Sequence, residues 1–130
     1  MQQPIHILLV DNDPSLLKLF GTKLAMEGFE VLYAHDGNEG RETARATKPD
    51  LIVTDFMMPV MDGLEMAMRL KSEKETSHIP IIFLTSLMDK PEAVKAAKEI
   101  GALEFLHKGI ELSEFVEHVR KILDAQPKSL

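Results

Sequence analysis

The chain has 130 residues, which is enough for one domain with a single core. Its composition, 45% hydrophobic and 28% charged, is that of a folded soluble protein, and the lack of cysteine excludes disulfides and thiolate metal sites. The formal net charge of −6 argues against direct contact with nucleic acid, because phosphate binding requires clustered Lys and Arg.

Five apolar runs of strand length alternate with amphipathic stretches of helical length. The runs are Ile5 to Val10, Glu30 to Ala34, Leu51 to Thr54, Pro80 to Leu84 and Leu103 to Leu106. The first run is broken by Asp11, so it is too short for a secretory signal or a membrane span. We therefore expect a cytoplasmic protein with no membrane partner.

The first helix is expected after the first run, where Asp13 and Pro14 form an N-cap followed by a proline at the first helical position. Its apolar residues recur with a helical period, and it is expected to end near Gly28. The second helix is expected at roughly Asn38 to Thr47, although Gly40 and Arg41 occupy positions where an apolar stripe would be useful.

Two further helices are expected toward the end of the chain. Asp89 and Glu92 form a capping-box pattern before a helix that Gly101 ends. A last helix is defined by apolar residues at helical spacing: Leu112, Phe115, Val116, Val119, Ile122 and Leu123. We expect residues 1–125 to form one domain, and residues 126–130 to be a flexible tail or a clipped linker.

Strands that are unbroken apolar runs are typical of a parallel sheet covered on both faces. The pattern predicts an α/β fold of the flavodoxin-like (βα)5 type, a doubly wound sandwich with strand order 2-1-3-4-5. In such a sheet, ligands bind at the carboxyl ends of the strands, where the order reverses between strands 1 and 3.

Polar residues follow the strands at this edge. Asp11 and Asn12 follow the first strand and Asp55 follows the third, which predicts an acidic pocket that a hard divalent cation such as Mg²⁺ would stabilise. Thr85 follows the fourth strand and Lys108 follows the fifth. A carboxylate nucleophile, a metal, a hydroxyl and a cation are the groups that phosphoryl transfer requires.

Four segments resemble the receiver domains of two-component response regulators, including the single-domain chemotaxis type. They are LLVDNDP, VTDFMMPVMDG, FLTS and FLHK, and they occur in the order and spacing of that family. The resemblance implies that Asp55 is the phosphoacceptor and that Lys108 binds the phosphate. It also implies that Mg²⁺ is bound by Asp11, Asn12, Asp55 and the backbone carbonyl of Met57.

The same resemblance implies a signalling switch rather than an ordinary turnover enzyme, although the domain would assist its own phosphoryl transfer and dephosphorylation. Thr85 would be the switch hydroxyl and Phe105 the aromatic switch residue. The donor would be a histidine kinase or a phosphotransfer protein. The target is unknown, and the responding surface, on the fourth helix, fifth strand and fifth helix, is also a possible homodimer interface.

Two residues depart from the family pattern. Asn12 stands where an acid usually binds the metal, and Gly109 stands where a proline commonly follows the lysine. The cis lysine-proline bond of the family is therefore absent, and a cis bond without proline would cost about 2.5–4 kcal/mol.

Two alternative functions stay open. One is a pseudo-receiver that binds a partner without phosphorylation. The other is a haloacid-dehalogenase-like phosphatase with Asp11 as nucleophile, because the segment DNDPS resembles the D-x-D-x-T/S element of that family. The second alternative leaves VTDFMMPVMDG unexplained.

Overall fold

The computed structural model describes residues 3–56, 58, 60–86 and 91–126. It contains one parallel sheet of five strands in the order β2-β1-β3-β4-β5, which confirms the predicted topology. The strands are β1 (His6–Val10), β2 (Glu30–Ala34), β3 (Leu51–Thr54), β4 (Ile81–Thr85) and β5 (Glu104–His107). The helices are α1 (Pro14–Met26), α2 (Gly37–Thr47), α3 (Gly63–Ser72), α4 (Pro91–Glu99) and α5 (Leu112–Ala125).

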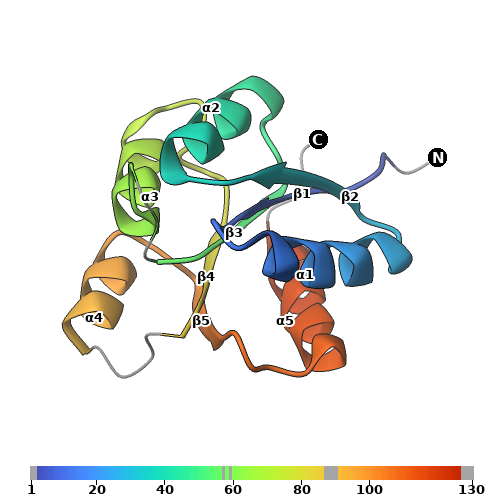
Figure 1. Ribbon diagram of the computed structural model, residues 1–130. Helices are drawn as coiled ribbons and strands as arrows, with labels where there is room; N and C mark the ends of the chain where they lie inside the picture. Colours follow the sequence, from blue (N-terminus) through green and yellow to red (C-terminus); the bar gives the residue numbers. More distant parts are fainter. Residues whose placement is uncertain (1–2, 57, 59, 87–90, 127–130) are drawn as a thin grey trace.

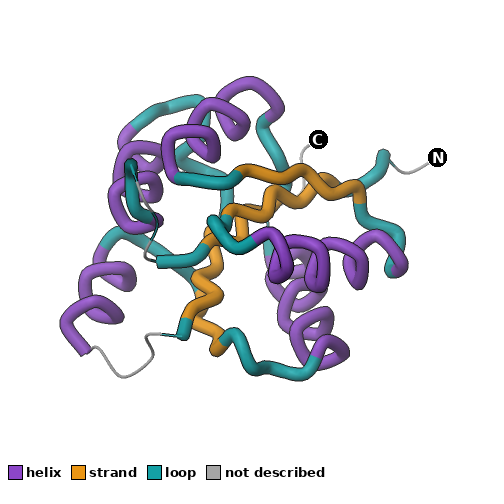
Figure 2. Tube along the Cα trace, viewed as in Figure 1, coloured by secondary structure: helices purple, strands orange, loops and turns teal. Residues whose placement is uncertain are grey.

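The helices cover both faces of the sheet, as Figures 1 and 2 show. Helices α1 and α5 pack on one face, where Phe20 and Phe115 meet edge to face with ring centroids 4.8 Å apart. Helices α2, α3 and α4 pack on the other face through small or flexible buried residues that include Ala44, Met66 and Ala97. Alternate residues of each central strand enter the two cores, which explains why these strands are apolar throughout.

The last two strands each begin and end one residue later than predicted. Strand β4 runs to Thr85 and β5 runs to His107, because these two residues are paired in the sheet. Polar residues at the ends of parallel strands carry no apolar signal, so a prediction from hydrophobicity ends such strands too early. Both corrections extend the strands toward the edge of the sheet where the sequence predicts a site.

Helix α1 begins as predicted, because the Asp13 side chain accepts a hydrogen bond from the Ser15 amide at 3.0 Å. It ends at Met26, two residues before the predicted end near Gly28. Gly28 has φ +97° and donates to the Ala25 carbonyl at 3.1 Å, so it belongs to the turn that follows the helix.

Helix α2 begins at Gly37, one residue earlier than predicted, because the Asp36 side chain accepts from the Glu39 amide at 2.8 Å. Gly40 lies on its buried face. A Cβ at Gly40 would lie 2.7 Å from the Met66 sulfur and 3.1 Å from Val10 methyl groups. Glycine therefore lets α2 approach the sheet and α3 closely, which explains why the narrow buried face of this helix lacks large apolar side chains.

Helix α4 begins at Pro91, and the predicted cap Asp89 lies outside the described residues. In the part of the chain that the structure describes, every helix is too short or too polar to cross a bilayer.

Candidate functional site

The carboxyl ends of β1 and β3 bring two aspartates together. Val10 and Thr54 are paired in the sheet, so Asp11 and Asp55 are the next residues along two adjacent strands. The Asp55 amide donates to the Val10 carbonyl at 3.0 Å, which continues the ladder into the site. The two residues are only 2% and 7% exposed.

Lys108 connects the two carboxylates. Its Nζ lies 3.0 Å from Oδ2 of Asp11 and 2.9 Å from Oδ2 of Asp55. The Lys108 amide donates to the Thr85 carbonyl at 3.2 Å, so the backbone that carries this ammonium is attached to the end of β4. The structure therefore brings together three of the residues that the sequence placed at this edge.

Burial and neighbouring charges shift the pKa values of Asp11 and Lys108. Burial raises the pKa of the Asp11 carboxyl, and the nearby Asp55 charge raises it further, against the lowering effects of the Asp13 amide and Lys108. Burial alone would lower the pKa of Lys108, but its hydrogen bonds to Asp55 and Asp11 raise it above the ordinary value. The lysine therefore stays charged at neutral pH.

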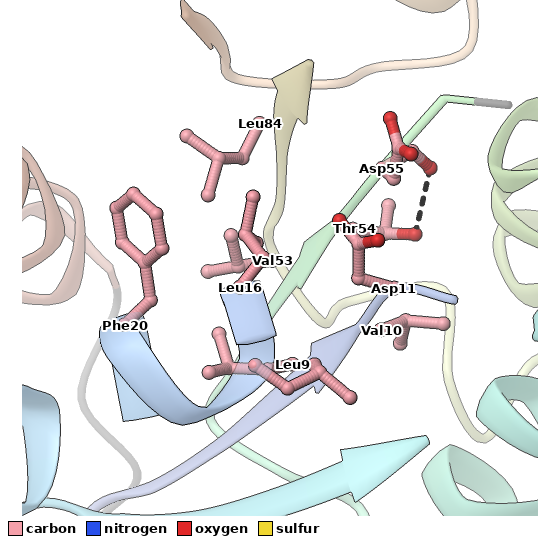
Figure 3. A pocket seen from close by; sticks show the side chains of 10 residues that line it. Leu9, Val10, Asp11, Leu16, Phe20, Val53, Thr54, Asp55 and Leu84 are labelled. Carbon is pink, nitrogen blue, oxygen red and sulfur yellow. Dashed lines mark hydrogen bonds between the residues drawn. The ribbon is translucent and has the colours of Figure 1, made fainter. Parts of the chain in front are cut away.

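The floor beneath the carboxylates is apolar. A cavity of about 10 Å³ lies against Asp11, Thr54 and Asp55, and its other walls are aliphatic or aromatic side chains of the sheet and α1 (Figure 3). The Thr54 hydroxyl donates to the Asp55 carbonyl oxygen at 2.9 Å, and the Phe56 amide donates to Oδ1 of Asp55 at 2.7 Å. These bonds fix the orientation of Asp55, and its Oδ2 faces Lys108.

The oxygen atoms of this site are suited to a hard divalent cation. Oδ2 of Asp11 and Oδ2 of Asp55 already converge on one positive charge, the Lys108 ammonium. Asn12 adds an exposed amide, while Met57 lies outside the described residues. Among the residues that the structure describes, no three acidic, histidine or cysteine side chains form a metal cluster. Two carboxylates with neutral oxygens suit Mg²⁺, which keeps several of its water ligands.

The Asp13 carboxylate serves the helix rather than the pocket. Its Oδ1 accepts from the Ser15 amide, while its own backbone amide donates to Oδ1 of Asp11 at 2.9 Å. Asp13 therefore caps α1 and orients Asp11 through the backbone alone.

Two glycines hold the loop between β3 and α3, and the sequence reasoning missed them. The Gly63 amide donates to the Phe56 carbonyl at 2.8 Å, and a Cβ at Gly63 would lie 1.9 Å from the Asp55 carbonyl oxygen. The Gly37 amide donates to the Met61 carbonyl at 3.0 Å, and a Cβ there would lie 2.0 Å from that oxygen. The dipeptide Asp-Gly at each helix start was the only signal available in the sequence.

Thr85 and Phe105 lie on the face of the sheet that α2, α3 and α4 cover. Thr85 is the last residue of β4 and is 1% exposed. Phe105 is half-buried and stacks on Phe83, with centroids 5.1 Å apart and rings inclined by 21°. The two residues therefore border one another diagonally across the paired strands β4 and β5.

The loop after Lys108 has the backbone expected from Gly109. Among the described residues every peptide bond is trans. The Gly109 amide donates to Nδ1 of His107 at 2.8 Å, a contact that a proline at this position could not make.

Residues 7–120 match the family model described as "Response regulator receiver domain". The chain is 35% identical over 122 residues to the Escherichia coli transcriptional regulatory protein GlrR, covering 94% of this chain and 27% of that protein. The chain spans about half or less of the length of the curated relatives it matches.

Two solved structures illustrate the likeness. The Vibrio cholerae chemotaxis protein CheY4 is 28% identical, with a TM-score of 0.86 over 92% of this chain and 99% of that one. The receiver domain of the Pseudomonas aeruginosa sensor histidine kinase PA1611 is 22% identical, with a TM-score of 0.86 over 95% and 100% of the two chains. That second structure has a magnesium ion coordinated in its active site cleft.

Proposed function

Since this chain belongs to the response regulator receiver domain family, we propose that it is a phosphorylation-dependent switch that accepts a phosphoryl group on Asp55. A histidine kinase or a phosphotransfer protein of a two-component system would be the donor. The observation that carries the proposal is the convergence of Asp11, Asp55 and Lys108, with Lys108 Nζ 3.0 Å and 2.9 Å from the two carboxylates.

Asp55 supplies the nucleophile. One oxygen, Oδ1, is fixed by the Phe56 amide, so Oδ2 is the oxygen that attacks the phosphorus. The new bond joins Oδ2 to phosphorus, the bond from phosphorus to the donor nitrogen breaks, and the electron pair of that bond stays with the donor. The Lys108 ammonium moves its hydrogen bond from Oδ2 to a phosphoryl oxygen, where it offsets the charge of the transition state.

Asp11, Asp55 and Asn12 would hold Mg²⁺, together with the backbone carbonyl of Met57, which lies outside the described residues. When bound, the ion supplies positive charge beside the phosphoryl oxygens. The residues of the chain orient the nucleophile, line the space beneath it with apolar side chains and supply the positive charge of Lys108. The proposed function is therefore a switch that would assist its own phosphorylation and dephosphorylation.

The signal leaves the site through Thr85 and Phe105. The Thr85 hydroxyl approaches the phosphoryl group, and Phe105 moves into the space that this shift opens. Phe105 is half-buried and stacks on Phe83, so its ring is at the edge of the core and is partly exposed to solvent. The resulting two-state change alters the surface of α4, β5 and α5, which a target protein or a second copy of the chain would bind.

Intact-mass spectrometry with a small phosphodonor and Mg²⁺ tests the function. The protein should gain one phosphoryl mass, Asp55→Asn should gain none, and the control Asp36→Asn should behave as the unchanged protein because the Asp36 side chain caps α2. Persistent stoichiometric labelling of Asp55→Asn would contradict the assignment.

A phosphorylation-independent binding module is the second candidate. Asn12 favours this candidate because an amide stands where a third carboxylate could attract Mg²⁺. Lys108 already offsets part of the negative charge of the two carboxylates Asp11 and Asp55. Absence of uptake in the unchanged protein would select this candidate. Membership of the receiver family argues against the dehalogenase-like alternative, which requires Asp11 as nucleophile.

A further inference from the structure

The loop that follows β5 is closed by a histidine side chain. The backbone amide of Gly109 donates to Nδ1 of His107 at 2.8 Å, and the Ile110 amide donates to the His107 carbonyl at 3.0 Å. Lys108 lies between the two residues that this side-chain bond joins. Its own amide donates to the Thr85 carbonyl at 3.2 Å. The direction in which the Lys108 side chain leaves the backbone is therefore set by these contacts.

The bond from Gly109 fixes the protonation state of the imidazole. A backbone amide can only donate, so Nδ1 of His107 must carry a lone pair and the ring proton must be on Nε2. In an imidazolium both nitrogens carry protons, and Nδ1 and the Gly109 amide would then be two donors facing each other. The loop closure is compatible with neutral His107 and incompatible with its charged form.

We propose that His107 is a positioning residue for Lys108, acting through the backbone amide of Gly109. While His107 is neutral, the loop holds the Lys108 ammonium against Asp11 and Asp55. When the imidazole takes up a proton, this hold is released and phosphoryl transfer slows. The proposal rests on the proposed function of Asp55 and Lys108. In this chain the hydrogen bond between Gly109 and His107, which depends on pH, would hold the loop in place of a rigid proline.

The surroundings of His107 contain other groups that titrate. It lies on the wall of a groove of about 420 Å³ between β5 and α5, with Glu111, Glu114 and His118 on the same walls. His118 Nδ1 lies 2.8 Å from Oε1 of Glu104. Lys108 is the next residue along the chain, and from β4 the paired residue is Thr85, which does not titrate in this range. A test must therefore isolate His107 from these neighbours.

Two substitutions separate the hydrogen bond from the charge. His107→Asn keeps a side-chain acceptor near the position of Nδ1 but cannot take up a proton, whereas His107→Leu keeps bulk and loses the acceptor. His78→Gln, at an exposed histidine before β4 and hence at the opposite end of the sheet, is the matched control. All other ionisable groups are common to these proteins. Their effects therefore cancel when the uptake rate of a variant is divided by that of the unchanged protein.

The rate of phosphoryl uptake from phosphoramidate is measured at fixed Mg²⁺ and ionic strength, from about pH 8 to about pH 5.5, the range in which imidazoles ordinarily titrate. The uptake rate of His107→Asn divided by that of the unchanged protein should rise as pH falls. The expected rise is about two- to tenfold, which is the effect of one exposed hydrogen bond. His107→Leu should be slower by a similar factor at high pH and should lose that deficit at low pH. For His78→Gln the ratio of uptake rates should not change with pH.

The proposal would be overturned if the rate ratio of His107→Asn to the unchanged protein did not change with pH. It would also be overturned if His107→Leu were as fast as the unchanged protein at high pH. ¹⁵N NMR of the imidazole is a second test, and it does not require phosphorylation. The neutral ring should carry its proton on Nε2, and the Gly109 amide resonance should shift as the ring takes up a proton. A proton on Nδ1 would refute the bond. If the unchanged protein takes up no phosphoryl group, the proposed function fails, and the NMR result decides the contact by itself.

Discussion

Substitution of Lys108 by methionine removes a positive charge that lies between two buried carboxylates. Asp11 and Asp55 are 2% and 7% exposed, and each lies within about 3 Å of the lost ammonium. Removing one partner of a buried ion pair costs about 3–5 kcal/mol. The Lys108 side chain is 20% exposed, so water reaches the site, and we expect the lower end of that range, about 3 kcal/mol.

The assay is thermal unfolding in chelator and in excess Mg²⁺. For a domain of this size, about 3 kcal/mol corresponds to a fall in Tm of about 10 °C. Mg²⁺ should restore much of the loss and should stabilise Lys108→Met more than the unchanged protein, because the ion replaces the missing charge. Lys18→Met, at an exposed lysine of α1, is the control for loss of one positive charge.

The pH dependence of this variant follows from Asp11. Its folded pKa is raised, so the stability gained from its protonation is present below the ordinary aspartate pKa and is lost as pH rises through the folded value. Without Lys108 that pKa should rise further. The deficit of Lys108→Met should therefore be complete near neutral pH and shrink in acid. A Tm equal to that of the unchanged protein in chelator, or equal Mg²⁺ stabilisation of both, would refute the bridging role.

The remaining predictions concern the metal and the switch. Asn12→Asp adds a carboxylate beside Asp11 and Asp55, so Mg²⁺ binding measured by titration should tighten about tenfold or more, equivalent to about 1.4 kcal/mol, and stability in chelator should fall. Equal metal dependence of the two proteins would show that Asn12 does not face the ion. Thr85→Ala should still accept a phosphoryl group but lose the NMR shift changes on α4, β5 and α5, and unaltered shifts would contradict the coupling to Phe105.

The fold could be predicted because the strands are buried on both faces. Residues such as Leu8 and Leu9 enter opposite cores, so the apolar runs are continuous and their number and order limit the topology. Asp11, Asp55 and Lys108 could be placed at one edge for the same reason, since the carboxyl ends of parallel strands meet there. This part of the site is a consequence of topology.

Contacts made by backbone atoms could not be predicted in the same way. Gly37 and Gly63 are needed because a Cβ would meet a carbonyl oxygen at 2.0 Å and 1.9 Å, which depends on how α2, α3 and β3 approach one another in space. The departure at Gly109 was visible in the sequence, but its partner His107 was not, because its acceptor role depends on the conformation of the loop. Strand ends at Thr85 and His107 carry no apolar signal.

The central claim is that Asp55 carries the phosphoryl group, and locating that group tests it most directly. The protein is treated with phosphoramidate and Mg²⁺, reduced with borohydride, which converts an aspartyl phosphate to homoserine, digested, and sequenced by tandem mass spectrometry. Homoserine at position 55 alone is the predicted result. Homoserine at position 11, or a chain that carries no modification at all, would contradict the account.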